Sequence, residues 1–520
     1  MSVAGTLRQR PDAALGPAGT PPGLRVLWVL LGVVAAAAVA AFTVLAVRRA
    51  TYPYQIEWLE GGAVEHVRRI LQGRALYPAP SVDFVAYPYP PLYFLLSAGV
   101  ALLTGVGYLP LRIVSIAGSL ASMGLLYAIV RREGGARWCG LVAAGLFAAG
   151  FRVTGGFYDV ARVDALLVAL LLGSLFAAAR ARSHRGFAAA GLLLALAALT
   201  KQSALLAGLP VAAVLLLRDR RQGLAFLAGA LVPAGAVSLV LQATSSGWYG
   251  RTVVGVVAGH GIDPTWWTGF WTHDLAPHLL PAAGLVALAL WWRPAGRWHV
   301  YLAGAAGMVG ASYVSRLHSA SSENVLIPVL AAVALTAGLV LTRLPTRAAW
   351  QQVVAGGLCL AQFGYLAYHP ARQIPPPSQT ATARRLQAVL RRLPGEVLVV
   401  SHPWETTLAG KGDHAHAGAI SDVVRSHDAA PRAAVEASIA AALQAQRFSV
   451  LAFDNDQDYA GFPADLERWY RRVPPPPGLG PPAAPTLETP FVGHPTQWWV
   501  ARRLGSSGTL RGALAGNPLP

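Results

Sequence analysis

The chain has 520 residues, of which 54% are hydrophobic and only 13% are charged, and its mean hydropathy is +0.45. Apolar runs of Leu, Ala, Val and Gly recur from residue 24 to about residue 368, which is the pattern of a polytopic membrane protein. The net charge of +18 does not indicate nucleic-acid binding, because the Arg residues occur in short clusters between apolar runs.

The first apolar run, residues 24–47, is too long for the apolar part of a secretory signal peptide. We therefore expect an uncleaved membrane anchor behind a disordered cytoplasmic leader of residues 1–23. Cys139 and Cys359 are the two cysteines of the chain, and each falls inside a predicted helix. Neither a disulfide framework nor a cysteine-based metal site is expected.

Short segments rich in Arg separate the later apolar runs. They contain Arg131, Arg132 and Arg137; Arg180, Arg182 and Arg185; Arg218, Arg220 and Arg221; Arg293 and Arg297; and Arg343 and Arg347. Because short cytoplasmic loops are enriched in Arg and Lys, we place all five on the cytoplasmic face. The alternation then requires about eleven transmembrane helices in residues 24–368.

The outward-facing loops of this topology follow directly from the placement of the Arg clusters. They are residues 48–109, 152–164, 201–202, 244–275 and 314–323, and residues 369–520 also lie outside. The apolar run 92–103 is short and follows two prolines, so we interpret it as a re-entrant or interfacial helix of the first loop. Arg48 and Arg49, just outside the first span, run against the topology rule.

From about residue 370 the sequence alternates short apolar runs with helical patterns. The expected elements are a helix at 381–392, a strand at 397–400, a helix at 430–446, a strand at 450–453 and a closing edge strand at 498–501. Residues 369–520 are therefore predicted to form a small extracytoplasmic α/β domain.

Carboxylates beside a membrane are costly to desolvate, so the first outer loop is a candidate site. Glu57 and Glu60 are three residues apart and share one face if the segment is helical. A carboxylate pair facing a cavity suits a general base or a metal ligand. The alternative is an amphipathic interfacial helix whose carboxylates are solvated.

Two further outer segments carry charges at helix ends. Asp159, Arg162 and Asp164 precede an apolar helix, and they form either an anchoring ion pair or part of a site. Lys201 and Gln202 follow another helix. The ammonium there either extends to the membrane interface or contacts an anionic phosphate.

The loop 244–275 is rich in Trp and Tyr, which is typical of an interfacial belt but also suits a lid or a sugar-stacking surface. Arg251 in this loop is a candidate phosphate ligand. Arg316, Glu323 and Asn324 lie near the start of a later span, where they form either a cap or part of a site.

Metal-binding patterns are weak. His402, Asp413, His414 and His416 resemble zinc ligands only loosely. The residues Asp454, Asp456, Asp458 and Asp465 have calcium-loop spacing, but Tyr459 replaces the required Gly. No cofactor is assigned, and a divalent metal stays open.

The order of the outer-loop motifs resembles the polytopic glycosyltransferases of the GT-C superfamily, which includes the lipid A aminoarabinose transferases and protein O-mannosyltransferases. The matching elements are Glu60, Gly73, Leu76-Tyr77, Pro90-Pro91-Leu92-Tyr93, Arg162-Val163-Asp164, Thr200-Lys201 and, more loosely, Glu323-Asn324 with Pro328. The resemblance covers roughly residues 24–345. The family usually has Asp directly before the conserved Glu, and that position is Leu59 in this chain.

The resemblance implies transfer of a sugar from a polyprenyl-phosphate carrier to an acceptor glycan, lipid or protein on the extracytoplasmic face of the plasma (inner) membrane. It implies an inverting displacement with a carboxylate base, for which Glu60 is favoured and Glu57 is the alternative. The catalytic set is then Glu60, Glu57 and Asp164. The substrate-binding set is Arg162, Asp159, Lys201, Gln202, Arg251, Arg316, Glu323, Asn324 and Tyr93.

Two other functions are compatible with a polytopic membrane protein. A transporter or flippase of lipid-linked sugars would place ionisable groups near the bilayer midplane, whereas here they lie at predicted outer helix ends. A non-catalytic scaffold that presents residues 369–520 leaves the ordered outer-loop motifs unexplained.

Overall fold

A computed structural model describes residues 21–292, 297–319, 321–479 and 493–504. The leader up to residue 20, Arg293 of the fourth Arg cluster and the Pro/Ala run at 481–485 lie outside the described residues. In the described part, five helical segments are long and apolar enough to cross a membrane. They are α1 (Pro22–Ala50), α4 (Tyr108–Arg132), α9 (Arg220–Thr244), the segment Thr265–Trp291 and the segment Glu323–Thr346.

The last two of these segments are composite. The first joins α11 (Thr265–Gly269), the π-helix η2 (Phe270–Leu275) and α12 (Ala276–Trp291), and the second contains η3 (Glu323–Leu326), α14 (Ile327–Leu341) and η4 (Leu344–Thr346). The other bundle helices are α3 (Leu92–Thr104), α5 (Arg137–Ala149), α6 (Asp164–Arg180), α7 (His184–Ala198), α8 (Ala204–Arg218), α13 (Trp298–Leu317) and α15 (Ala349–Tyr365). The 13 residues of α3 extend about 20 Å, less than the hydrocarbon thickness of about 30 Å.

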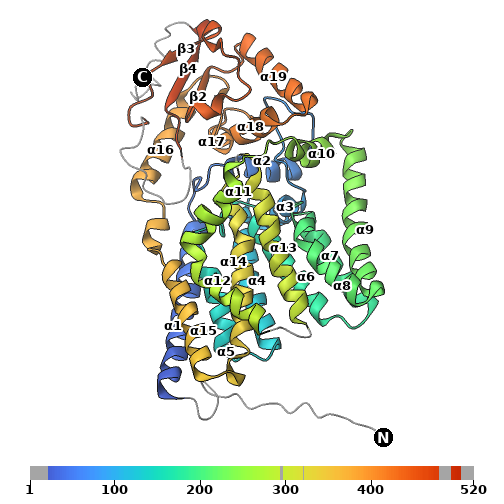
Figure 1. Cartoon of the computed structure of the whole chain (residues 1–520). Helices are drawn as coiled ribbons and strands as arrows, with labels where there is room; N and C mark the ends of the chain where they lie inside the picture. The colour runs from blue at the N-terminus through green and yellow to red at the C-terminus, as the bar shows by residue number, and fades with distance from the viewer. Residues whose placement is uncertain (1–20, 293–296, 320, 480–492, 505–520) are drawn as a thin grey trace.

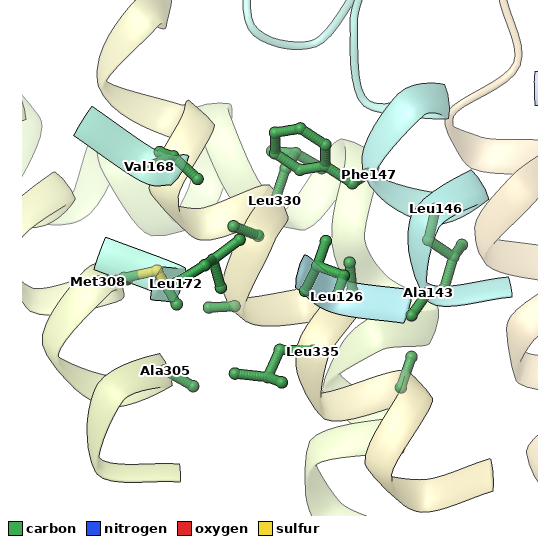
Figure 2. Packing of buried hydrophobic residues seen from close by; sticks show 14 of the residues in the cluster. Leu126, Ala143, Leu146, Phe147, Val168, Leu172, Ala305, Met308, Leu330 and Leu335 are labelled. Atoms are coloured by element: carbon green, nitrogen blue, oxygen red, sulfur yellow. The ribbon is translucent and has the colours of Figure 1, made fainter. Parts of the chain in front are cut away.

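The centre of the bundle is α14. In its most apolar window 89% of the residues are buried, compared with 11% for α9. Leu330 and Leu335 of α14 lie among Phe147, Leu172 and Met308 from three neighbouring helices (Figure 2). Both α14 and α9 are almost entirely apolar, because a helix that faces lipid and a helix that faces the protein interior need side chains of similar polarity. Their buried fractions therefore distinguish the two helices, whereas their compositions do not.

Helices α7 and α9 pack with their backbones in close contact. A β-carbon at Gly191 would lie 2.0 Å from the carbonyl oxygen of Phe226, and one at Gly229 would lie 2.1 Å from that of Ala188. Small residues are what allow such close packing between helices in a membrane.

The Arg-rich loops meet at one end of the bundle. Arg218 contacts His299 at 2.7 Å, the guanidinium of Arg343 lies 4.8 Å from the ring centre of Trp298, and Arg131 donates to the carbonyl of Gly135. The N-terminal end of α1 lies at the same end, opposite the C-terminal sheet (Figure 1). The clustering agrees with the predicted alternation, whereas which side of the membrane each end faces stays a prediction.

The other end of the bundle is covered by short elements. These are α2 (Glu60–Leu71), α10 (Trp248–Gly250), the π-helix η1 (Arg251–Val256) and α11, together with the loops around residues 51–59, 72–91 and 150–163. Figure 1 shows α2, α10 and α11 at this end, on the side of the bundle that faces the C-terminal region.

The C-terminal region contains a four-stranded sheet with helices around it. Its elements are η5 (Pro370–Gln373), α16 (Pro377–Arg392), β1 (Val397–Val399), α17 (Pro403–Leu408), α18 (Ala417–Arg425), α19 (Ala429–Gln444), β2 (Val450–Phe453), η6 (Asp456–Tyr459), η7 (Leu466–Arg468), β3 (Tyr470–Val473), β4 (Gln497–Ala501) and η8 (Arg502–Leu504). The strand order is β1-β2-β4-β3, with β1 and β2 parallel and the other pairs antiparallel.

Two details of this sheet differ from the sequence expectation. The run at 498–501 is not an edge strand, because β4 pairs with β2 on one side and with β3 on the other. The edge is β3, which the hydrophobic pattern did not reveal because its two central residues are Arg471 and Arg472. Charged residues are common on edge strands because they discourage further pairing.

The C-terminal region packs directly on α2 and α4. Thr407 of α17 donates a 2.6 Å hydrogen bond to Glu65 of α2, and Tyr108 at the start of α4 donates to Glu405 of α17 at 3.1 Å. Residues of both parts share one buried apolar cluster. The sheet and the outer loops therefore form one continuous packed unit.

Candidate active site

The two carboxylates of the first outer loop do not share a helix face. Helix α2 begins at Glu60, and Glu57 lies in the loop before it. Both side chains are nevertheless fully buried, with exposed fractions of 1% for Glu57 and 0% for Glu60. The expectation of solvated carboxylates on an amphipathic helix is therefore wrong, and so is the expectation of a shared helical face.

Glu60 is saturated with hydrogen-bond donors. Arg112 of α4 binds both carboxylate oxygens, through Nε at 2.9 Å and Nη2 at 2.7 Å, and the backbone N–H groups of Ile56 and Ala161 donate at 2.7 and 2.9 Å. Burial raises the pKa of Glu60, but the Arg112 guanidinium outweighs it and holds that pKa below its usual value. Glu60 is therefore an ionised carboxylate with no free lone pair directed at a substrate.

Arg112 uses its remaining N–H groups on the same loop. It donates to the carbonyl oxygens of Arg49, Tyr52 and Tyr54 at 3.1, 2.6 and 2.7 Å. The ion pair with Glu60 thus fixes the path of the chain from the end of α1 to the start of α2.

Glu57 has far fewer partners. Its Oε2 accepts from the N–H of Leu59 at 3.0 Å, and its Oε1 lies 3.4 Å from Nη1 of Arg162. Burial raises the pKa of Glu57 to about 7, although the charge of Arg162 opposes this shift. A carboxylate with a pKa near neutrality suits proton transfer, because both of its protonation states are accessible.

A chain of alternating charges continues from Glu57 into the bundle. Nε of Arg162 lies 3.9 Å from Oδ2 of Asp164 and has no hydrogen-bond partner among the residues that the structure describes. Asp164 accepts from Nζ of Lys201 at 2.7 Å and from the amide of Asn324 at 3.0 Å. Four sequence-predicted site residues from three outer segments are therefore brought into one cluster with Glu57.

Pockets lie on both sides of this charge chain. On one side, Tyr87, Tyr89, Tyr93 and Phe94 line a pocket with Arg162. On the other side, a pocket between α6, α8 and α13 is lined by Asp164 and Lys201 together with Ser203, Ser312 and Ser315. An almost entirely apolar pocket follows deeper in the bundle and shares the lining residues Leu171 and Ala207.

Three predicted substrate-binding residues have structural partners instead. Asp159 forms a fully buried 2.9 Å ion pair with Arg49, which also explains why Arg49 departs from the topology rule. Gln202 donates to the carbonyls of Pro88 and Val253, and the hydroxyl of Tyr93 donates to the carbonyl of Leu111 at 2.9 Å. Tyr93 still contributes its ring to the aromatic pocket.

The outer arginines are separate from the charge chain. Arg251 is half exposed and lies 3.4 Å from Asp428 of the C-terminal region. Arg316 is bound by both oxygens of Asp274 at 2.8 and 3.1 Å, and its guanidinium lies 3.6 Å from the ring centre of Trp266. Glu323 is 4.0 Å from Arg316 and is partly exposed.

Arg112 and Arg49 are important residues that the sequence reasoning did not place in the site. Arg112 was detectable, since an Arg within an otherwise apolar helix generally needs a buried partner. Arg49 was noticed only as an exception to the topology rule. The described residues contain no group of three or more His, Cys, Asp or Glu side chains that could hold a metal ion, so no reaction step is assigned to a metal.

Comparisons with known proteins bear on the family resemblance and on the fold. The sequence model of the dolichyl-phosphate-mannose-protein mannosyltransferase family matches residues 89–248. The crystal structure of ArnT from Cupriavidus metallidurans in the apo state superposes with a TM-score of 0.53 at 14% identity, covering 83% of this chain and 93% of ArnT. The same enzyme bound to undecaprenyl phosphate gives 0.51 at 15% identity, covering 73% and 84%. A search of curated protein sequences gave no match.

The fold is that of a polytopic helical membrane protein with the architecture of the GT-C glycosyltransferases. The resemblance to the GT-C superfamily that the outer-loop motifs indicated is confirmed. At these levels of identity the structural likeness concerns the fold.

Proposed function

We propose that this protein is a glycosyltransferase that moves a sugar from a polyprenyl-phosphate carrier to an acceptor hydroxyl. The observation that carries the proposal is the buried chain of Glu57, Arg162, Asp164 and Lys201 between an aromatic pocket and a pocket with an apolar floor. Sugar rings pack well on aromatic side chains, and an isoprenoid needs an apolar channel beside its phosphate.

Glu57 is the proposed general base. It is buried, it has one hydrogen bond from the backbone, and its pKa is raised to about 7. Glu60, which the sequence resemblance favoured, serves as the fixed anion that binds Arg112 and shapes the loop. The environment of the two carboxylates, rather than the motif match, supports the choice.

Lys201 and Arg162 are the proposed phosphate ligands. Lys201 lines the pocket that continues into the apolar one. Nε of Arg162, which donates a hydrogen bond to no described group and lies 3.9 Å from Asp164, provides a further donor. Asp164 and Asn324 orient these cations rather than the phosphate, because Asp164 accepts from Lys201 and from Asn324. Oriented cations near a leaving phosphate stabilise the charge that develops on it.

The reaction balances without a covalent enzyme intermediate. The acceptor oxygen forms a bond to the anomeric carbon while the bond from that carbon to the phosphate oxygen breaks. The acceptor proton passes to Glu57, and polyprenyl phosphate leaves with the electron pair. Because attack and departure occur on opposite faces of the sugar, the anomeric configuration is inverted.

The topology belongs to the same proposal. About eleven spans in residues 24–368, an extracytoplasmic α/β domain in residues 369–520 and a cytoplasmic N-terminus place the charge cluster at the outer face of the plasma (inner) membrane. Clustering of the Arg-rich loops at the opposite end of the bundle supports this orientation.

The proposal is tested by following the sugar of the donor. Membranes that contain the protein are incubated with polyprenyl phosphate carrying labelled mannose or labelled arabinose, and the label that leaves the carrier is measured. We expect release with at least one donor, and the Glu57→Gln variant should lower it about 100-fold or more. Movement of intact donor across the membrane without release would instead support a transporter, and full activity of Glu57→Gln would rule out the base assignment.

A further inference from the structure

The peptide bond between Trp58 and Leu59 is held from two sides. Its N–H donates to Oε2 of Glu57 at 3.0 Å. Its carbonyl oxygen accepts from the amide of Gln55 at 2.6 Å and contacts Nε2 of His416 at 2.7 Å. His416 belongs to the C-terminal region, 358 residues further along the chain. One peptide group therefore connects the proposed base to the C-terminal region.

The hydrogen-bond pattern fixes which nitrogen of His416 carries the proton. Nδ1 accepts from the backbone N–H of Gly418 at 2.9 Å and so caps helix α18. A neutral imidazole that accepts at Nδ1 is protonated at Nε2, so Nε2 donates to the carbonyl of Trp58. Burial lowers the pKa of His416 to about 3, which keeps the ring in this neutral form.

Gln55 is oriented in the same way by a second histidine. Nδ1 of His402 lies 3.3 Å from Oε1 of Gln55, and its Nε2 lies 3.0 Å from Oδ2 of Asp454. Both neighbouring atoms are acceptors, so both ring nitrogens donate and His402 is an imidazolium. The Gln55 amide is thereby turned with its nitrogen toward the Trp58 carbonyl.

We propose that His416, and His402 through Gln55, are positioning residues that let the C-terminal region hold Glu57 in its reactive orientation. This inference rests on the proposed role of Glu57 as the base. Two donors from one direction fix the carbonyl of the Trp58–Leu59 peptide, and because the peptide is planar its N–H must point the opposite way. Among the described residues, that N–H is the one backbone group that donates a hydrogen bond to the Glu57 carboxylate.

Fixing the Trp58–Leu59 peptide should affect the pH dependence of the reaction, which a purely structural role of His416 would not do. The bond from Leu59 is one of the interactions that lower the pKa of Glu57 against burial. If the peptide can rotate, this bond weakens and the pKa of Glu57 rises further. The pH below which activity is lost should then move upward, while donor binding at Lys201 stays the same.

The test uses the full-length protein with His416→Asn. Asn is a good helix cap and preserves the bond to Gly418, but its shorter side chain does not reach the Trp58 carbonyl. We expect kcat to fall about tenfold to a hundredfold, the acid limb of the pH–rate profile to move to higher pH, and KM for the donor to stay within about twofold. Gln55→Met, which removes the second donor from the loop, should change the same quantities in the same direction.

His414→Asn is the matched control. His414 is also buried in the C-terminal region, but it contacts Thr406 and Val399 rather than the loop of Glu57. This variant should lose thermal stability without a shift of the acid limb.

Hydrogen exchange of the Leu59 amide separates this inference from the proposed function, since it needs no turnover. Faster exchange in His416→Asn and Gln55→Met, but not in His414→Asn, would support the positioning even if no donor were cleaved. Unchanged exchange together with an unchanged acid limb in both variants would overturn it, whatever the activity of the wild type.

Discussion

Two buried ion pairs lie side by side at the outer end of the bundle, and they differ in how completely they are satisfied. Glu60 and Arg112 have donors and acceptors at almost every polar atom. Glu57 and Arg162 are joined by one 3.4 Å contact, and within the described part of the chain Nε of Arg162 has no hydrogen-bond partner. Burial of a charge alone therefore does not single out either carboxylate, and the incomplete pairing of Glu57 next to a pocket is what supports its proposed role.

The largest effect is expected when the charge of Glu60 is removed from its ion pair with Arg112. Glu60→Gln leaves the charge of Arg112 buried without its counter-ion, which costs about 3–5 kcal/mol when one partner of a buried pair is removed. We expect aggregation or loss of the monodisperse peak in detergent, and a large drop in thermal stability. Glu57→Gln is the control, and it should fold normally because Glu57 has few partners. Normal folding of Glu60→Gln would contradict the structural role.

A smaller effect is expected at the far end of the charge chain. Lys201→Met removes the cation that faces the pocket with the apolar floor, and a hydrogen bond to a charged group contributes about 1.5–3 kcal/mol. KM for a polyprenyl-phosphate donor should rise about 10-fold to 100-fold. Arg251→Met is the control, because this half-exposed residue pairs with Asp428 and should change KM by less than about threefold. Equal effects of the two substitutions would show that the phosphate binds elsewhere.

The smallest expected effect is the pH dependence of kcat/KM, which should follow the pKa of Glu57 and not that of Glu60. A general base acts in its deprotonated form, and the pKa of Glu57 is raised to about 7, so kcat/KM should fall as pH decreases through about 7. The lowered pKa of Glu60 predicts no titration of that group in this range. The measurement is kcat/KM between pH 5.5 and pH 8.5 in wild type and in His414→Asn. A kcat/KM that stays constant down to pH 5.5 would be inconsistent with Glu57 as the base.

Much of the site could be read from the sequence because the outer ends of membrane helices are marked by charge. Positive clusters fixed which loops share an end of the bundle, and this was enough to bring Asp164, Lys201 and Asn324 together with the first loop. The order of the motifs then indicated the GT-C superfamily. The alternation of short strands and helices also predicted β1, β2, α16 and α19 of the C-terminal region, but not α17 or α18.

What the sequence did not reveal depends on contacts between distant segments. Whether Glu57 or Glu60 is reactive depends on Arg112, which lies 52 residues from Glu60 in the chain. The hydrogen bond to the Trp58 carbonyl comes from His416, which lies 358 residues away in the chain. Spacing rules apply within a helix or a strand, so they carry no information about such pairs. The central position of β4 was missed for the same reason.

The strand order of the C-terminal sheet also determines when this part of the chain can fold. Strand β4 separates β2 from β3, although both precede it in the sequence. While the ribosome is still adding residues before 497, β2 and β3 have no partner between them and the sheet stays incomplete. Because chains emerge at about 5–20 residues per second, the bundle helices have many seconds to insert first. The sheet is therefore completed only after every residue of the bundle and of the loop of Glu57 has been synthesised.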